Sequence, residues 1–394
     1  MLAGHRGHDL GLRNRVDWLL DPARAEKILE DLQRLRDEDP PPCRVAGGMT
    51  AEPLPVALEA YTLYARVNLN DPTTWYSVET LMKRLRRLLE ELLGPELGML
   101  PTSGGSESAL TGLYIAREAT GRNIVMASRA AHASIAKAAR ILGMRLIEAP
   151  VDYDLRLDVD SLRRLLRAHQ GRVAVVVVTL GVTDNGAIDP ILEAAEAAWE
   201  SGAVLYVDAA WGGFPLLGRP AARGMILPRS GPALVGIDFH KHITPPPSGV
   251  LLANTPELLD VVEYQAPYMP SGRQQGLPWT RTAAGLAAAV AALEALGQDG
   301  VEKLAQHLYE LAERVAEGLR AAGIPVQGGP STPLVAFNVG RRADSVAEAL
   351  RRQGWILYPS RLPGVLRYVA KWCHTRSDVE EIVETVALAA SRGL

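Results

Sequence analysis

Residues 173–213, with the sequence VAVVVVTLGVTDNGAIDPILEAAEAAWESGAVLYVDAAWGG, decide the fold class of this chain. The stretch begins with a continuous apolar, β-branched run (173–180), which is typical of a strand buried on both faces. An alanine-rich helical segment (191–200) follows, and a second apolar run (203–207) comes after it. A strand, a helix and a strand in this order predict parallel strands of one sheet with a covering helix.

The same alternation continues on both sides of this stretch. Apolar residues at helical spacing predict a helix over 78–92 that Gly94-Pro95 ends, and another helix follows Gly104-Gly105. Further strands are predicted at residues 123–127, 145–149, 234–237 and 249–253. The pattern indicates an α/β fold built on a mostly parallel sheet that is covered on both faces.

The two ends of the chain differ from this central part. Residues 1–40 are polar, carry apolar residues at helical spacing over 23–35, and run into Pro40-Pro41-Pro42, which must break a helix. We therefore expect an N-terminal arm over 1–50 and a large domain over 51–278. A long Ala/Leu helical region (282–322) and strands at 333–339, 355–358 and 365–369 predict a small C-terminal α/β domain over 279–394.

Composition excludes several classes of protein. The 394 residues include 42 Lys and Arg against 45 Asp and Glu, a balance that argues against a nucleic-acid binder. No charge-free apolar run reaches about 18 residues, so no membrane span is expected. The N-terminal residues 1–15 lack the apolar stretch of a signal peptide. Cys43 and Cys373 are too few for a disulfide framework, so we interpret them as structural and predict a reducing cytoplasm.

Lysine is rare in this chain, which makes one lysine conspicuous. The chain has six lysines: Lys27, Lys83, Lys137, Lys241, Lys303 and Lys371. Lys241 follows a predicted strand and lies between His240 and His242. A lone lysine is usually a solvated surface residue, but one with a lowered pKa forms Schiff bases.

Three other motifs follow predicted strands or precede predicted helices, and ligands of such sheets bind beyond the strand ends. Asp208 ends an apolar strand in VDAAWGG and is either a turn-capping acid or the partner of a cationic ring nitrogen. TSGGSES (102–108) is either a helix cap or an anion cradle, and it lacks the lysine of a P-loop. His132 begins a predicted helix. It is either a capping or packing residue or a group that stacks on a flat ligand.

Pyridoxal 5′-phosphate needs all four of these features. Its phosphate needs a cradle, its ring a stacking group and an acid at the pyridine nitrogen, and its aldehyde a lysine. The order of cradle, histidine, acid and lysine therefore predicts pyridoxal phosphate as cofactor, and no metal is expected.

The sequence resembles the group II pyridoxal-phosphate-dependent decarboxylases, in particular the archaeal L-tyrosine/L-aspartate decarboxylases. The resemblance runs from about Gly47 to the C-terminus and rests on GGMTAEPLP and VNLNDPTTW (within 47–75) and, in family order, SGGSES, HASIAKA, VTDNGAID, VDAAWGG, DFHK and APYM. It implies the fold type I of pyridoxal-phosphate-dependent transferases, with a seven-stranded type of sheet in the large domain. It also implies a homodimer.

The resemblance assigns roles to residues at matching positions. Lys241 matches the lysine that binds the cofactor covalently, and Asp208 matches the partner of the pyridine nitrogen. Ala210 and His132 match the groups that pack on the two faces of the ring. Gly105 and Ser106 match the phosphate cradle, with His240 beside it, and Thr183 matches a residue near the ring.

Residues that act on the substrate are predicted less directly. Tyr268 resembles a mobile-loop tyrosine that protonates the carbanion, in its own subunit or in the partner subunit of a dimer; its alternative is a packed loop aromatic. Arg367, and second Arg281, are candidates for the cation that binds the substrate carboxylate, although either could be structural. Trp211 stands where Phe or Tyr is common, and its bulk would narrow the substrate pocket. His374 is a weaker candidate.

The predicted activity is the α-decarboxylation of an L-amino acid. The resemblance implies L-aspartate to β-alanine, for coenzyme A biosynthesis, or L-tyrosine to tyramine, for methanofuran biosynthesis, and we favour aspartate. The alternatives are an L-glutamate decarboxylase and a related carbon–carbon lyase that cleaves a phosphorylated amino alcohol. A non-catalytic relative would be expected to have lost Lys241 or Asp208, and both are present.

Overall fold

The computed structural model describes residues 19–391 and divides the chain into two units, Met1–Pro41 and Pro42–Leu394. In the first unit, α2 (Pro22–Asp37) confirms the predicted helix, and the side chain of Asp21 caps its N-terminus by accepting from the backbone N–H of Ala23. The N-terminal residues 1–15, for which no signal peptide is predicted, lie outside the described residues.

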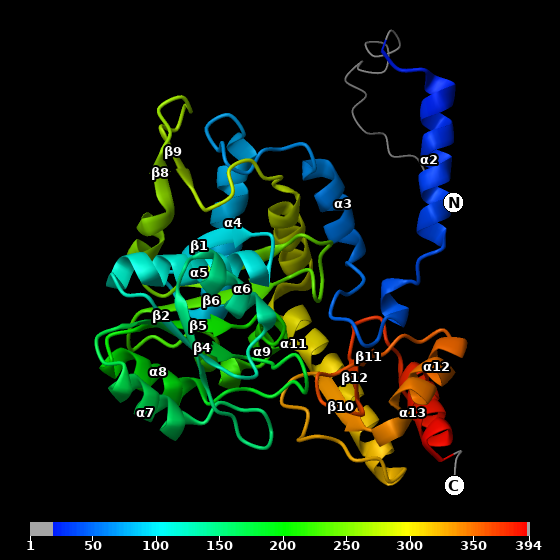
Figure 1. The fold of residues 1–394 in the computed structure, drawn as a ribbon. Helices are drawn as coiled ribbons and strands as arrows, with labels where there is room; N and C mark the ends of the chain where they lie inside the picture. The colour runs from blue at the N-terminus through cyan, green and yellow to red at the C-terminus, as the bar shows by residue number, and fades with distance from the viewer. Residues whose placement is uncertain (1–18, 392–394) are drawn as a thin grey trace. The chain divides into compact units, whose positions relative to one another are not determined.

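The second unit is built on a seven-stranded sheet (Figure 1). The strand order is β1-β7-β6-β5-β4-β2-β3, and only β7 runs antiparallel to its neighbours, which confirms the mostly parallel sheet. The strands are β1 (Gly98–Thr102), β2 (Ile124–Ser128), β3 (Arg145–Ala149), β4 (Val173–Thr179), β5 (Val204–Asp208), β6 (Ala233–Asp238) and β7 (Gly249–Ala253). Sequence patterns missed β1, which is short and contains Pro101.

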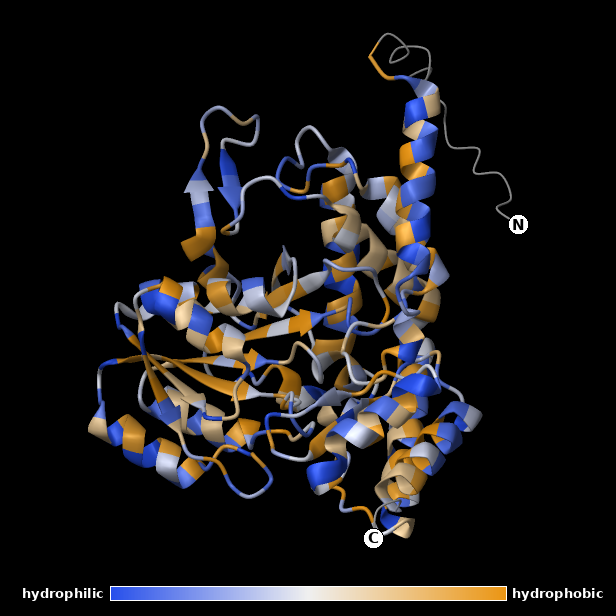
Figure 2. Ribbon diagram, turned by 45° about the vertical axis from the view of Figure 1, so that its right-hand side comes forward, coloured by the Kyte–Doolittle hydropathy of each residue, from blue (hydrophilic) through white to orange (hydrophobic). Residues whose placement is uncertain are grey.

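Alternate residues of each central strand pack into different cores, because successive side chains point to opposite faces of a sheet. In β4, Val175 and Val177 join a core with α5 and α6, whereas Val176 and Val178 join a core with the helices of the other face. Figure 2 shows these central strands as strongly hydrophobic between helices of mixed character. The helices are α3 (Pro55–Tyr64), α4 (Tyr76–Leu93), α5 (Gly105–Thr120), α6 (Ala133–Ile141), α7 (Val159–Ala168), α8 (Ile191–Glu200), α9 (Gly213–Leu217), α10 (Arg223–Ile226) and α11 (Ala284–Ala321).

A second, smaller sheet with its own core follows α11. It is antiparallel, in the order β10-β12-β11, and packs with α12, α13 and the end of α11. Its elements are β10 (Leu334–Asn338), α12 (Ala343–Arg352), β11 (Tyr358–Pro359), β12 (Val365–Val369) and α13 (Arg376–Ser391). The strand predicted at 355–358 is confirmed only at its end, because Trp355 is a core side chain outside the strand. The domain limits at 50/51 and 278/279 stay predictions.

Residues 42–50 pack with this small sheet. Ala46 is a member of its core, and the backbone N–H groups of Gly47 and Val369 join the two segments through the carbonyls of Ile356 and Ala46. Cys43 and Cys373 form a disulfide, a pairing that the sequence did not predict because 330 residues separate them. Location in the cytoplasm stays a prediction.

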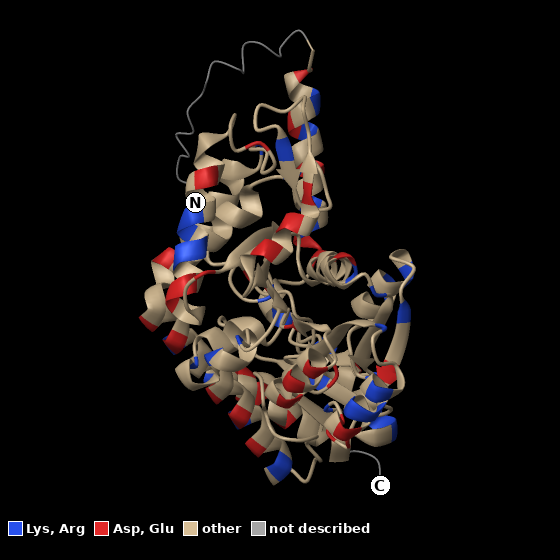
Figure 3. Ribbon diagram, turned by 90° about the vertical axis from the view of Figure 1, so that its left-hand side faces the viewer, with Lys and Arg blue, Asp and Glu red and all other residues tan. Residues whose placement is uncertain are grey.

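The remaining features concern the surface. A short hairpin, β8 (Glu263–Gln265) and β9 (Arg273–Gln275), stands out from the large sheet (Figure 1). Figure 3 shows acidic and basic residues interspersed over the helices rather than gathered on one side. Within residues 19–391, no helix has the length and apolar character needed to cross a membrane, and no group of potential ligands suggests a metal ion.

The buried His374 predicts acid sensitivity of the fold. Burial lowers the pKa of this histidine from 6.5 to about 4, so between these values the unfolded chain binds a proton that the folded chain does not. Stability should therefore fall as the pH drops from 6.5 to 4, with a contribution from His374 on the order of 3 kcal/mol. Urea unfolding at both pH values should show a smaller pH dependence in His374→Gln than in the wild type.

His169→Gln on the end of α7 is the matched control and should keep the wild-type pH dependence. Other titrating groups are present in all three proteins, so their contributions cancel in the comparison. An unchanged pH dependence in His374→Gln would contradict the prediction.

Candidate active site

A cavity of about 420 Å³ opens beyond the carboxyl ends of β4, β5 and β6. This is where ligands bind in open sheets of this kind. The cavity is lined by Met49, Ser103, Gly104, Gly105, Ser106, His132, Ser134, Thr179, Gly181, Thr183, Asp208, Ala210, Trp211, Asp238, His240, Lys241 and Arg367. Nine of the sequence-predicted site residues are thereby brought together: Lys241, Asp208, Ala210, His132, Gly105, Ser106, Thr183, His240 and Arg367.

Lys241 lies three residues beyond the end of β6 and is held by an acid that sequence patterns missed. Its Nζ is 3.0 Å from Oδ2 of Asp238, the last residue of β6. Asp238 is 1% exposed, and its other carboxylate oxygen has no hydrogen-bond partner among residues 19–391. Since a buried carboxylate without a cation is costly, the pair fixes the lysine at the base of the cavity. The signal was available, because Asp238 ends an apolar strand as Asp208 does.

Asp208 ends the neighbouring strand, β5, and is buried. Its Oδ1 accepts a long hydrogen bond of 3.3 Å from the backbone N–H of Ala210. Burial raises the pKa of Asp208, and the charge of Lys241 opposes this shift. A carboxylate in this setting would be stabilised as an anion by a further cationic N–H group in the cavity.

The N-terminus of α5 forms a tight anion cradle against this base. Gly104 adopts a φ of 139°, and a Cβ there would lie 2.7 Å from Cε1 of His240. A Cβ on Gly105 would lie 2.8 Å from the Cβ of Ala210. The backbone therefore approaches the cavity more closely than any side chain would allow, with the exposed Ser106 beside it.

His132 has the capping role that its position suggested, and it also reaches the cavity. It is the N-cap of α6, where Nδ1 accepts from the backbone N–H of Ser134 at 3.2 Å, and it also lines the cavity. Desolvation of its inner side lowers the pKa of His132, and the negative charge of Asp208 opposes this. The cap directs Nδ1 to the backbone, so the neutral ring carries its proton on Nε2.

Arg367 projects from β12 of the small sheet into the same cavity. Its Nε donates to the carbonyl of Gly47 at 3.2 Å and its Nη1 to the carbonyl of Thr183 at 2.7 Å. Nη2 makes no hydrogen bond to any residue within 19–391. Burial lowers the pKa of Arg367, yet a guanidinium stays charged near neutrality, so a partly desolvated cation faces the cavity.

Arg281 and Tyr268 do not line this cavity. Arg281 donates to the carboxylate of Glu107 at 2.9 Å and to the carbonyl of Pro101 at 2.7 Å, so it ties α5 to β1. Tyr268 lies between β8 and β9, is 74% exposed and stacks on Trp279. His374 lies in the small-sheet core, where it bonds to Tyr368 and Cys43.

Comparison with known proteins places the chain in a family. The pyridoxal-dependent decarboxylase conserved domain matches residues 110–256. A protein of Methanothermobacter thermautotrophicus described as a probable L-tyrosine/L-aspartate decarboxylase is 33% identical, over 83% of this chain and 92% of that protein. The chain belongs to the pyridoxal-dependent decarboxylases.

Other relatives agree with this family. A probable L-aspartate decarboxylase of Halobacterium salinarum is 37% identical to this decarboxylase over 79% of this chain and 86% of that protein. A structure of Oryza sativa TDC with PLP and tryptamine has a TM-score of 0.79 at 19% identity, covering 89% of this chain and 84% of that one, and shows the shared fold. The enzyme is thus a carboxy-lyase that uses pyridoxal phosphate.

The cavity of this decarboxylase fits its cofactor on observations of its own. The glycine cradle admits a phosphate close to the backbone, and the carboxylate of Asp208 has room for a cationic ring nitrogen. Ala210 leaves space that a larger side chain would fill, and Lys241 offers an amine at the base. These groups supply an anion site, an acid and a nucleophile, which is the set that pyridoxal phosphate requires.

The glycine cradle yields a test of cofactor binding. Gly105→Ala places a methyl group 2.8 Å from the Cβ of Ala210, so the start of α5 must shift. Since overpacking costs about 1–3 kcal/mol, pyridoxal phosphate should bind the cofactor-free variant about tenfold or more weakly. Equilibrium dialysis of the cofactor measures this. Gly329→Ala, where a Cβ would meet nothing within 4 Å, is the control, and equal affinity in both variants would refute the cradle.

Proposed function

We propose that this decarboxylase converts L-aspartate to β-alanine and CO₂. The observation that carries the proposal is the supply of cations and hydrogen-bond donors in the cavity wall, where Lys241, Arg367, two histidines and five hydroxyl side chains lie. A phenol ring gains its affinity from apolar walls, whereas a second carboxylate needs donors and cations. The names of relatives also support it, since those of Halobacterium salinarum and Archaeoglobus fulgidus are described as probable L-aspartate decarboxylases.

Bound pyridoxal phosphate supplies the electron sink that makes loss of CO₂ from the α-carbon possible. Asp208 would keep the ring nitrogen of the cofactor protonated, and Gly105, Ser106 and His240 would hold the phosphate. His132 would cover one face of the ring and Ala210 the other, with Thr183 at its edge. The presence of all these residues in the wall of one cavity supports these roles.

Arg367 is the residue that would bind the substrate carboxylate. Two carbonyl groups orient its guanidinium, and Nη2 remains for a ligand. Arg281 is less suited, because its donors are used by Glu107 and by carbonyls away from the cavity. A fixed guanidinium binds a carboxylate in a defined position through two parallel hydrogen bonds.

The proton that replaces CO₂ would come from Lys241 or from Tyr268. Lys241 carries protons next to Asp238 inside the cavity. Tyr268, exposed and outside the wall of its own cavity, would act in the cavity of a second subunit, so we include a homodimer in the proposal. The exposed position of the hairpin supports this arrangement.

Product analysis tests the substrate. The holoenzyme is incubated separately with L-aspartate, L-tyrosine and L-glutamate while CO₂ and the amine are measured. We expect β-alanine as the main product and no turnover in Lys241→Ala. Tyramine as the main product would overturn the aspartate assignment and favour the other activity that names such as that of the Methanothermobacter relative contain. The aspartate assignment would also be overturned if the main product were the amine formed from glutamate, or if the substrate were cleaved without release of CO₂.

Substitution of Arg367 tests the carboxylate site. Hydrogen bonds to charged groups contribute about 1.5–3 kcal/mol, so Arg367→Gln should raise KM about 10- to 100-fold. Arg367→Lys keeps the charge and should be less impaired. Arg352→Gln, at an exposed position on α12, is the matched control. Such measurements scatter by about twofold. If the KM of Arg367→Gln stays within about twofold of the wild-type value, Arg367 does not bind the substrate carboxylate.

A further inference from the structure

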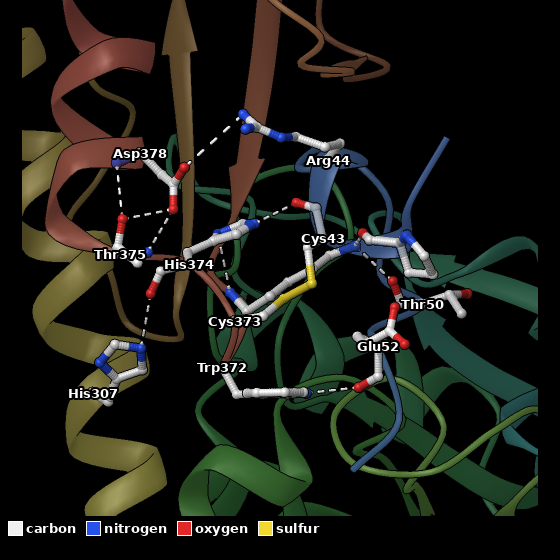
Figure 4. Close-up of a disulfide and its surroundings, with 12 residues drawn as sticks. Cys43, Arg44, Thr50, Glu52, His307, Trp372, Cys373, His374, Thr375 and Asp378 are labelled. Atoms are coloured by element: carbon white, nitrogen blue, oxygen red, sulfur yellow. Dashed lines mark hydrogen bonds and ion pairs between the residues drawn. A yellow bond between two sulfur atoms is a disulfide. The ribbon is translucent and has the colours of Figure 1, made fainter. Parts of the chain in front are cut away.

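Residues 371–374, which follow the last strand of the small sheet, bind to residues 42–54. We call residues 42–54 the strap. Cys373 is joined to Cys43 by the disulfide, and His374 bonds to the carbonyl of Cys43 at 2.8 Å (Figure 4). Trp372 donates from Nε1 to the carbonyl of Glu52 at 2.6 Å, so the strap is tied to residues 371–374 near both of its ends.

Lys371 is the least ordinary of these anchors. It is 2% exposed and has no ion pair with a carboxylate among residues 19–391. Its Nζ instead donates to the carbonyls of Pro42 and Thr50, each at 2.6 Å. Burying an ammonium is costly: burial lowers the pKa of Lys371 to about 8, although the charge of Glu52 opposes this shift. Its two bonds to the strap are therefore made at a cost in stability.

The other side of the strap reaches the active site. The carbonyl of Gly47 accepts from Nε of Arg367, and Met49 lines the cavity. The backbone N–H of Leu54 bonds to the carbonyl of Ile243, two residues beyond Lys241. The strap therefore connects the disulfide to the arginine that binds the substrate and to the loop that carries the cofactor lysine.

The backbone of the strap is tightly packed at Gly47. A Cβ on Gly47 would lie 2.0 Å from the backbone nitrogen of Tyr358, so the strap is pressed against β11 at that residue. A displacement of the strap would move the Gly47 carbonyl and with it one of the two bonds that orient Arg367. The other bond, from Nη1 to the carbonyl of Thr183, would then hold the guanidinium alone.

We propose that the Cys43–Cys373 disulfide is a positioning element for substrate binding, which acts through the strap by holding the Gly47 carbonyl that orients Arg367. This proposal rests on the carboxylate role of Arg367 stated above. It makes substrate affinity, more than the chemical step, depend on the oxidation state of two cysteines outside the cavity wall. Cys43 and Cys373 are positioning residues, because neither lines the cavity.

A purely structural disulfide would behave differently. Disulfides stabilise mainly by restricting the unfolded chain, so loss of the bond would then lower the melting temperature and leave KM unchanged. The positioning role predicts a rise in KM, a kcat close to that of the wild type, and no additional effect once Arg367 is gone. These three readouts separate the two cases.

The experiment compares the oxidised holoenzyme, the same protein treated with a phosphine reductant, and Cys43→Ser/Cys373→Ser. The phosphine supplies two electrons and becomes its oxide with oxygen from water, and each cysteine gains a proton as a thiol. Using the amino acid among aspartate, tyrosine and glutamate that turns over fastest, we expect KM to rise about 3- to 10-fold in both bond-free forms. Reoxidation should restore the original KM.

The chain provides its own controls. It has only two cysteines, so the reductant must leave the kinetics of the double serine variant unchanged. Hydrogen exchange of the strap amides gives a readout apart from activity, and it should become faster when the bond is absent. In Arg367→Gln, breaking the bond should change KM by less than about twofold.

The outcomes separate failure of the proposal from failure of the carboxylate assignment. If Arg367→Gln raises KM but breaking the bond does not, the positioning role is wrong. A normal KM in Arg367→Gln removes the carboxylate role itself, whatever the disulfide does. Free thiols that do not pair in the oxidised protein would also overturn the proposal. If the serine variant fails to fold, the reduced wild type still decides.

Discussion

The active site depends on one constraint: the central strands are buried on both faces and end together at one edge of the sheet. β4, β5 and β6 are adjacent, and their last residues are Thr179, Asp208 and Asp238. Polar side chains cannot turn into either hydrophobic core without losing hydration, so they face the space beyond the strand ends. In the cavity these polar side chains lie outside both cores. The positions of its two acids are set by where their strands end rather than by the conformation of a loop.

Electrostatics then determine what the cavity can hold. Two nearly buried carboxylates lie at its base, and the nearest cation is Lys241, which pairs with Asp238. Asp208 keeps a raised pKa through burial, although Lys241 lies close enough to oppose the shift. A cofactor with a cationic ring nitrogen and an anionic phosphate complements this pattern, because the acid and the cradle lie at different parts of the wall. The cofactor therefore completes the charge balance of the site.

The small C-terminal sheet contributes little of the cavity wall, but the contacts around it orient one residue of that wall. Arg367 enters from β12, and its orientation depends on carbonyls of residues 47 and 183, which belong to distant parts of the chain. The strap and residues 371–374 hold one of these carbonyls in place. The side of the cavity around Arg367 is thus assembled from three segments, whereas Asp208 and Asp238 stand at the ends of adjacent strands of one sheet. This difference explains why the strand-end side is the more predictable half.

Strand periodicity determined the sheet, and strand-end residues indicated the cofactor, because local patterns report local burial. Thus β4, β5 and the positions of Asp208 and Lys241 followed from the sequence alone. Asp238 is also an acid at the end of an apolar strand, but the sequence pattern around it was interpreted through the neighbouring histidines and lysine. Only the tertiary structure could place Arg367 in the cavity wall, leave Arg281 and Tyr268 outside it, and join Cys43 to Cys373. Each of these depends on contacts between residues far apart in the chain, for which no local pattern of hydrophobicity, charge or spacing exists.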